Sequence, residues 1–140
     1  HDAPHTNSDL LFKGAVQDEA WSVYTGLIKI REHANGTAAY QTNRNLTLSE
    51  GAWAESVPNL DIRTNDVKCS HASTVGPIDE DQRFYLESRG IRPEVAERLV
   101  VLGFFDEVLA QLPAHDTTEG LRERVAAKLN IGAGHDGADS

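Results

Sequence analysis

Two patterns of apolar positions divide the chain near residue 78. Before it, short stretches rich in β-branched and aromatic residues alternate with polar ones, and Gly, Asn, Asp and Pro interrupt them at close intervals. After it, apolar residues recur at a period of about 3.6, which is typical of amphipathic helices. The pattern predicts a strand domain over residues 1–78, a helical domain over 79–131 and a disordered tail over 132–140.

Five strands are predicted in the first domain, over residues 10–16, 21–30, 37–48, 61–63 and 67–75. Turns are expected between them, including one at 57–59. Strong hairpin signals are few, and several asparagines fall at predicted turns or strand edges, as polar corner residues do in a stacked parallel solenoid. These are Asn43, Asn45, Asn59 and Asn65. A β-sandwich remains the alternative, because periodicity alone does not separate the two architectures.

Three helices are predicted in the second domain. Asp79, with Gln82 three positions later, resembles a capping box that begins a helix over residues 80–89. Gly90 suits the end of that helix, because glycine readily adopts the left-handed conformation found there. The third helix is expected to begin after Asp116.

The middle helix, predicted over 93–112, begins with Pro93 and is closed by Pro113. Its main apolar stripe comprises Val95, Leu99, Leu102, Phe105, Leu109 and Leu112. Further apolar residues lie off this stripe, namely Val100, Val101, Phe104 and Val108. The apolar surface is therefore wider than one packing face requires, so the helix either packs between two neighbours or presents a face to a partner.

The chain is acidic, with 13 Lys and Arg against 22 Asp and Glu and a net charge of −9 at pH 7. Because no basic cluster is present, nucleic acid is not expected as a partner. No apolar run reaches the roughly 18 residues of a membrane-spanning helix. The single cysteine cannot form an internal disulfide, which indicates a reducing compartment and hence the cytoplasm.

The candidate chemistry lies in VKCSHAS, residues 67–73, where the only cysteine precedes a histidine by two positions. On a strand, Cys69 and His71 project from the same face. A thiolate and a neutral imidazole both bind transition metals, but two ligands do not complete a zinc site or an iron–sulfur cluster. His1 and His5 could join them only if the fold returned the start of the chain to this strand. The simpler interpretation is a buried thiol and a hydrogen-bonded imidazole.

No self-sufficient active site is recognisable in the sequence. A cysteine protease places its thiol and its imidazole on different elements, whereas here they are near neighbours on one predicted strand. The sequence contains no phosphate-binding loop, GxSxG or HExxH motif. We therefore expect a protein without enzymatic activity, and a cysteine hydrolase is the least favoured alternative.

The string VKCSHASTVGPIDEDQRFYLESRGI, residues 67–91, closely resembles the signature of the SufD family, whose members are subunits of the iron–sulfur cluster assembly scaffold SufBCD. Two further stretches are similar to family segments in the same order, HDAPHTNSDLLFKG at 1–14 and AYQTNRNLTLS at 39–49. The resemblance implies a mainly β protein with α-helices, namely the C-terminal end of a right-handed parallel β-helix followed by a small helical domain. It also implies that this chain is the C-terminal part of a considerably longer protein.

The resemblance further implies two partners, since family members pair with the paralogue SufB at the end of the β-helix and bind the ATPase SufC through their C-terminal helices. His71 then lies at the interface with a SufB-like subunit and contributes to an iron–sulfur cluster that is assembled transiently with that partner. Cys69 matches a family cysteine position, where it is either a cluster ligand or packing inside the β-helix. Candidate SufC-binding residues are Val95, Leu99, Leu102, Phe105 and Leu109.

The sequence departs from the family pattern at two places. The usual Gly-Ala-Thr after the histidine is replaced by Ala72, Ser73 and Thr74, so a backbone conformation that requires glycine at residue 72 would be strained. Arg83 stands where the family commonly has an apolar residue, which is expected to alter how the first helix docks.

The expected function is that of a non-enzymatic scaffold subunit for iron–sulfur cluster assembly. It would work with a SufB-like paralogue and a SufC-like ATPase, and would bind neither nucleic acid nor membranes. The isolated end of a β-helix exposes an unpaired strand edge, so self-association is also expected. The rival hypothesis is a free-standing β-solenoid or sandwich module that binds a metal or a glycan.

Overall fold

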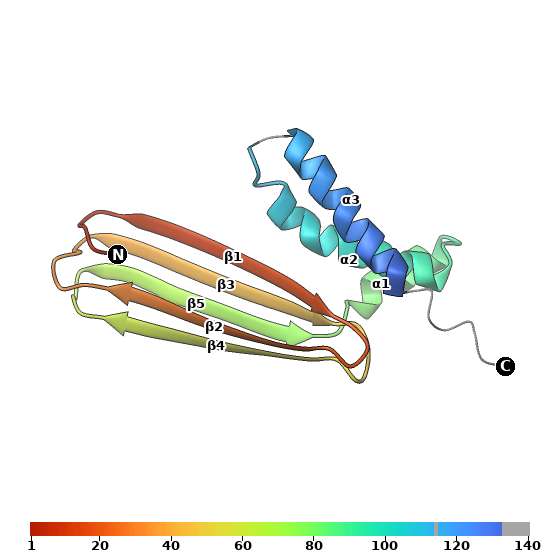
Figure 1. The fold of residues 1–140 in the computed structure, drawn as a ribbon, viewed down its shortest axis with the longest axis horizontal. Coiled ribbons are helices and arrows are strands. Elements are labelled where there is room, and N and C mark those ends of the chain that lie inside the picture. The colour runs from red at the N-terminus through yellow and green to blue at the C-terminus, as the bar shows by residue number, and fades with distance from the viewer. Residues whose placement is uncertain (114, 133–140) are drawn as a thin grey trace. The chain divides into compact units, whose positions relative to one another are not determined.

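The chain folds into two compact units, and the boundary lies between Gly76 and Pro77. The computed structural model describes residues 1–113 and 115–132 (Figure 1). The first unit contains five strands and the second contains three helices, counted over these residues. The change of hydrophobic period along the sequence therefore coincides with the change from strands to helices.

All strand pairs of the first unit are parallel. The strands are β1 (Asn7–Val16), β2 (Trp21–Ile30), β3 (Thr37–Thr47), β4 (Trp53–Ile62) and β5 (Val67–Gly76). They form a sheet of order β1-β3-β5 and a sheet of order β2-β4, so successive strands alternate between the two sheets (Figure 1). The predictions for β1, β2, β3 and β5 agree with the structure to within three residues at each end. Because every pair of described strands is parallel, no β-hairpin forms among them.

The fourth strand was predicted wrongly. The sequence pattern placed a short strand at 61–63 after a turn at 57–59, whereas β4 continues without a break from Trp53 to Ile62. Pro58 lies in the middle of this strand and suggested the turn. It is tolerated because β4 pairs with β2 alone, and an edge strand does not need the missing N–H for a second ladder.

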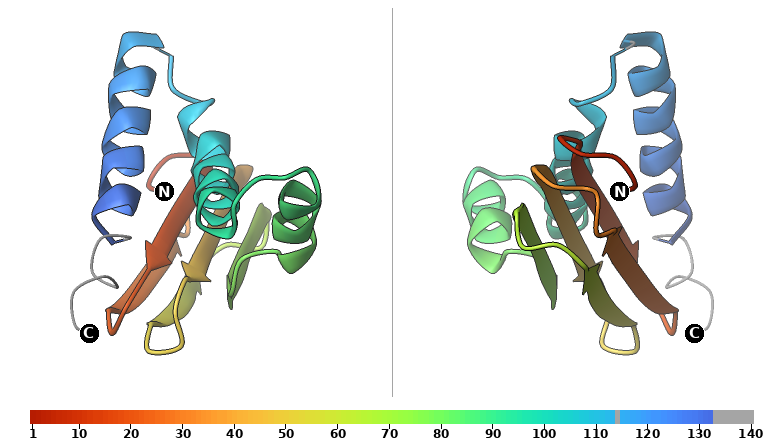
Figure 2. Two further views of the ribbon diagram at one scale, coloured as in Figure 1. Left: turned by 90° about the vertical axis from the view of Figure 1, so that its right-hand side faces the viewer. Right: turned by 90° about the vertical axis from the view of Figure 1, so that its left-hand side faces the viewer.

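The two sheets lie face to face (Figure 2). Alternate residues of β3 are buried. These residues are Thr37, Ala39, Gln41, Asn43 and Asn45. An apolar cluster occupies only one end of the interior, where Ile28, Ile30 and Ala34 pack together with Ala39. The remaining positions along β3 bury polar side chains.

Amide side chains fill this polar part of the interior. Gln41 Nε2 donates to Tyr24 Oη over 2.9 Å, and Asn45 Nδ2 donates to Asn43 Oδ1 over 2.7 Å. The prediction that Asn43 and Asn45 lie at turns or strand edges is therefore wrong, and the hydrogen bonds offset the cost of removing the amides from water. Gly26 makes room for Gln41, because a β-carbon there would lie 1.9 Å from Gln41 Nε2.

The second unit contains α1 (Glu80–Ser88), α2 (Pro93–Leu109) and α3 (His115–Gly132). Asp79 caps α1 by accepting hydrogen bonds from the backbone N–H groups of Asp81 and Gln82, and Gly90 follows the helix with a φ of 86°. The three predicted helices are present, and α1 and α2 begin at their expected signals. The prediction was wrong at two ends, because α2 ends at Leu109 rather than at residue 112 and α3 begins at His115 rather than after Asp116. Gly132 of the predicted tail is the last residue of α3, and the rest of that tail lies outside the described residues.

The buried face of α2 differs from the predicted stripe. Ala96, Val101 and Leu109 are the buried residues of the helix, whereas Leu99 is 44% exposed. Of these, Val101 had been assigned to the off-stripe surface. The helix contacts both α1 and α3, so its buried positions are set by two neighbours rather than by one continuous stripe.

Both departures from the family pattern are accommodated locally. Ala72 has no positive φ, so the backbone there does not require glycine. Arg83 forms ion pairs along its own helix, with Glu80 at 2.9 Å and Glu87 at 3.3 Å. Its side chain is 37% exposed, and such pairs contribute little beyond helix stability.

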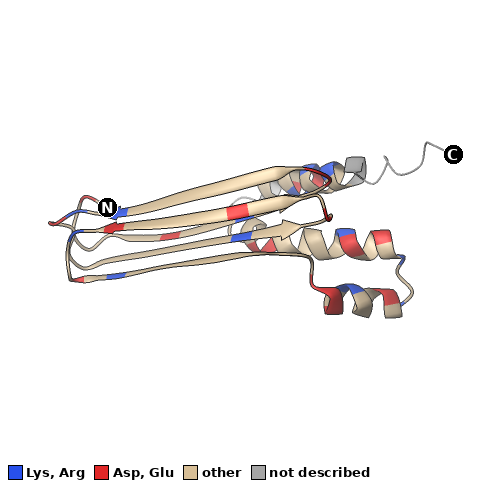
Figure 3. Cartoon of the chain, turned by 90° about the horizontal axis from the view of Figure 1, so that it is seen from below, with Lys and Arg blue, Asp and Glu red and all other residues tan. Residues whose placement is uncertain are grey.

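Charged residues of both signs are spread over the strands and the helices (Figure 3). No continuous basic stripe is present on the side of the described chain drawn there. No helix in the described ranges has the length and apolar character needed to span a membrane.

Replacing Gly26 by alanine tests the packing around Gln41. We expect Gly26→Ala to lower the free energy of unfolding by about 1–3 kcal/mol, because the new methyl group overlaps the buried amide. Urea denaturation measures the change. Gly76→Ala is the matched control, since a β-carbon at Gly76 meets nothing within 4 Å; an equal effect of the two substitutions would contradict the packing argument.

Candidate functional site

Cys69 and His71 lie two residues apart on β5, at an edge of the three-stranded sheet. The parallel register places Cys69 beside Ala39 and His71 beside Gln41, both of which are buried between the sheets. The cysteine and the histidine therefore project from the interior face of β5. They differ in burial, because Cys69 is half-buried and His71 is exposed.

The thiol of Cys69 packs against the apolar cluster that contains Ile28 and Ile30. Burial raises the pKa of this thiol above its ordinary value. A catalytic cysteine needs the opposite shift, since the thiolate is the nucleophile. This environment argues against a cysteine hydrolase and is consistent with a thiol that packs at the margin of the interior.

No group of three or more His, Cys, Asp or Glu residues in the described part of the chain is arranged to hold a metal ion. The histidines near the start of the chain do not complete the set. His1 bonds through its ring nitrogens to Thr6 Oγ1 at 2.7 Å and to Ser8 Oγ at 2.8 Å, next to β1. Because β1 and β5 are opposite edges of the same sheet, with β3 between them, His1 is not a neighbour of His71.

Interior-facing side chains of β4, the last strand of the other sheet, are also exposed. Leu60 and Ile62 of β4 remain 41% and 40% exposed, although their register partners on β2, Ile28 and Ile30, are only 5% and 0% exposed. Val75 at the end of β5 is 44% exposed. Apolar side chains that face the interior are thus left open at the end of the strand unit that carries His71, which is typical of a surface that another polypeptide covers.

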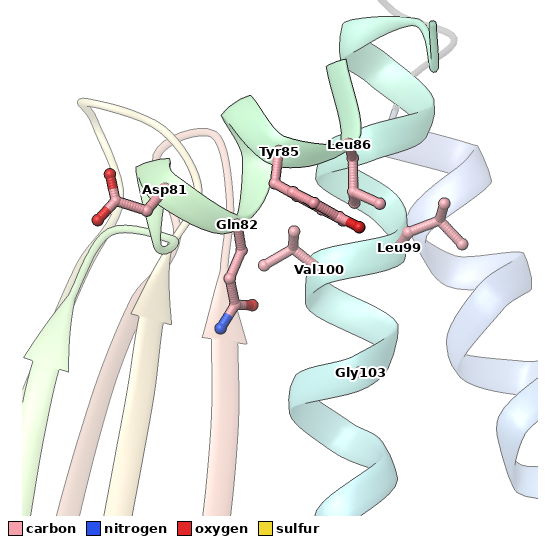
Figure 4. Close-up of a pocket in the computed structure, with 7 residues that line it drawn as sticks. All are labelled: Asp81, Gln82, Tyr85, Leu86, Leu99, Val100 and Gly103. Atoms are coloured by element: carbon pink, nitrogen blue, oxygen red, sulfur yellow. The ribbon is translucent and has the colours of Figure 1, made fainter. Parts of the chain in front are cut away.

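A second candidate site lies within the helical unit, between α1 and α2. A cavity of about 600 Å³ opens there (Figure 4). It is lined by Asp81, Gln82, Tyr85, Leu86, Leu99, Val100 and Gly103. The side chains of Tyr85, Leu86 and Val100 converge from the two helices, so the cavity has an apolar floor.

Large apolar side chains are exposed on α1 and α2. Tyr85 and Leu99, which line the groove, are 56% and 44% exposed, and Phe84, which is not among the lining residues, is 72% exposed. The guanidinium of Arg89 lies 5.1 Å from the centre of the Tyr85 ring and holds the ring by a cation–π contact. Asp81 is among the lining residues, but its carboxylate points away from Tyr85 and Val100 (Figure 4), so the groove suits an apolar segment.

The predicted partner-binding residues are distributed unevenly in the structure. Leu99 lines the groove, whereas Leu109 is buried and the side chains of Val95, Leu102 and Phe105 are half-buried. Sequence reasoning missed Phe84 and Tyr85 of α1. The signal for them was the FYL run at 84–86, whose consecutive apolar residues cannot all face one side of a helix.

Comparison with known proteins identifies the family of the chain. The family described as "SUF system FeS cluster assembly, SufBD core domain" matches residues 1–104. An iron-sulfur cluster assembly SufBD family protein of Mycobacterium tuberculosis is 42% identical over 139 residues, which cover 94% of this chain and 35% of that protein.

Two relatives carry the name iron-sulfur cluster assembly protein SufD. The Escherichia coli protein is 39% identical over 92% of this chain and 30% of its own length, and the Bacillus subtilis protein is 40% identical over 86% of this chain and 26% of its own length. The chain thus spans about a third or less of the curated relatives it matches. On this similarity, the chain belongs to the SufBD core family of the SUF iron–sulfur cluster assembly system and is a SufD-like member of it.

Proposed function

We propose that the protein is a non-enzymatic scaffold subunit for iron–sulfur cluster assembly in the cytoplasm. It pairs with a SufB-like subunit through the open end of its strand unit and binds a SufC-like ATPase through its helices. The observation that carries the proposal is the exposed His71 on an edge strand, which belongs to no group of three or more potential metal ligands in the described residues. A site shared between two polypeptides needs only part of its ligand set from each.

The strand unit is the C-terminal end of a right-handed parallel β-helix. Its repeat supports this proposal, because Asn7 pairs with Ala38 and Thr37 pairs with Val67, which are 31 and 30 residues apart. Trp21 pairs with Trp53 after 32 residues in the other sheet. A nearly constant spacing between stacked parallel strands is what successive turns of a solenoid produce.

The cluster is the cargo of this assembly. His71 supplies an imidazole nitrogen to iron, and the partner supplies the remaining ligands. Cys69 packs at the margin of the interior and adds a thiolate only if the opening of the interface exposes it. Opening follows from ATP binding and hydrolysis on the SufC-like partner, which shifts the population of conformations of the scaffold.

The helical groove is the docking surface for the ATPase. Its exposed aromatic and aliphatic residues are suited to an apolar helix or loop of the partner, in the helix-in-groove mode. Only residues 77–79 separate the end of β5 from the start of α1. A displacement of α1 on binding of the ATPase is therefore transmitted through this short connection to β5, the strand that bears His71.

The rival module that binds zinc or a glycan alone is not favoured. A metal module that works without a partner needs a closed set of ligands, and the described residues offer no such group. Four described strands, β1, β2, β4 and β5, have an unpaired edge, which provides for self-association of the isolated chain.

Removing the imidazole tests the shared site. In the full-length protein assembled with its SufB-like and SufC-like subunits, we expect His71→Ala to reduce cluster formation by about tenfold or more while the complex still forms. Visible absorption during anaerobic reconstitution measures the cluster, and size-exclusion chromatography measures assembly. Ser70→Ala is the matched control, because Ser70 is exposed on the opposite face of the same strand; undiminished cluster formation in His71→Ala would refute the role of the histidine.

Truncating the groove tests the docking surface. We expect Tyr85→Ala and Leu99→Ala each to weaken binding of the SufC-like ATPase by about 1–2 kcal/mol, because both remove exposed apolar area that lines the cavity. Isothermal titration calorimetry with the purified ATPase gives the affinity. Leu121→Ala on α3 serves as the comparison, since Leu121 is 37% exposed and does not line the groove. If all three variants bind equally well, the ATPase docks elsewhere.

A further inference from the structure

A layer of polar side chains crosses the interior of the strand unit at the level of His71. Gln41, the register partner of His71 on β3, is only 4% exposed and donates its Nε2 to Tyr24 Oη over 2.9 Å. Tyr24 in turn is the register partner of Ser56 on β4, whose hydroxyl is buried without a hydrogen-bond partner in the described structure. The layer therefore runs from His71 on one sheet to Ser56 on the other.

The fold keeps the Gln41 amide in a defined place. Its carbonyl carbon and both terminal atoms lie over Gly26, since a β-carbon there would meet all three within 3.1 Å. Burial raises the pKa of Tyr24 above its ordinary value, so the phenol stays neutral and remains a constant partner for the amide. An amide that is buried and hydrogen-bonded at one end has little freedom to rotate away.

One N–H of Nε2 is donated to Tyr24, which leaves the amide its second N–H and its carbonyl oxygen Oε1. Of these, Oε1 is the acceptor that can receive a hydrogen bond from a ring N–H. Neighbouring strands are about 4.8 Å apart, so the side chains of Gln41 and His71 are adjacent on the same face. The other sheet neighbour of Gln41 is Leu10, which has no polar side-chain group.

We propose that Gln41 is a positioning residue for His71. The two side chains are not hydrogen-bonded in the described structure, but the exposed ring of His71 can turn toward the side-chain carbonyl of its neighbour. The hydrogen bond formed in that way fixes the tautomer and the direction of the ring and leaves the other nitrogen for iron. Histidines that bind metals generally donate their second N–H to such an acceptor, which also raises the basicity of the ligand. The inference rests on the proposed role of His71 in cluster assembly and assigns to it a neighbour within the same chain.

The test separates positioning from folding by changing both ends of the hydrogen bond. Gln41→Met removes the amide at nearly constant length, and the double variant Tyr24→Phe/Gln41→Met replaces both partners by apolar groups, which is close to neutral for stability. Asn43→Leu is the matched control, because Asn43 is an equally buried amide on β3, at 3% exposure, but lies beside Ser73.

The first measurement is the tautomer of His71 at one fixed pH in the cluster-free, full-length protein. Selective ¹⁵N-histidine labelling and NMR report it, with the His71→Ala variant identifying the signal. We expect one dominant tautomer in the wild type and in Asn43→Leu. We expect a mixture of both tautomers in Gln41→Met and in the double variant.

The second measurement is cluster formation by the assembled complex, which we expect to fall by about tenfold in both Gln41 variants and to be retained in Asn43→Leu. If His71→Ala abolishes cluster formation but the double variant keeps the wild-type tautomer or wild-type cluster formation, the positioning role is wrong and the proposed function stands. If His71→Ala has no effect on cluster formation, the proposed function is wrong, and the tautomer measurement still decides whether Gln41 orients the ring.

Discussion

The parallel pairing of β3 with β5 is the constraint on which the rest of the strand unit depends. It sets Ala39 beside Cys69 and Gln41 beside His71, and it decides which face of β5 looks toward the other sheet. A slip of one residue would turn every side chain of β5 to the opposite face. The cysteine and the histidine would then leave the interior margin, and Lys68 and Ser70 would take their place. The chemistry assigned to this edge is therefore a consequence of register.

The interior that this register builds is polar for most of its length. Buried amides need partners in fixed positions, so they restrict the register more strongly than aliphatic side chains, which pack in several ways. Gly26 contributes to the same packing, because the absence of a side chain there leaves the space that Gln41 occupies between the sheets. A core of this kind explains why the strands pair in one register. It also explains why polar side chains lie next to β5, at the exposed end of the strand unit.

Two surfaces of the protein leave apolar side chains exposed. The strand unit exposes Leu60 and Ile62 beside the strand that bears His71, and the helical unit exposes Tyr85 and Leu99 in the lining of a groove. The match to the SufBD core family extends over both, since it covers residues 1–104 and thus β5, α1 and most of α2.

The sequence alone determined the ends of the local structural elements and the family to which this protein belongs. Asp79, Gly90 and Pro93 marked the helix ends because capping and backbone preferences act between near neighbours, and the string around His71 carried the family resemblance. Tertiary structure decided what depends on distant partners: Pro58 lies within a strand because β4 is an edge, and α2 buries Val101 because it has two helical neighbours. The amides of β3 belong to this second group. An asparagine or glutamine in a sequence is equally suited to a corner or to an interior, and only the Tyr24 hydroxyl and the space above Gly26, both contributed by another sheet, made the interior favourable for Gln41.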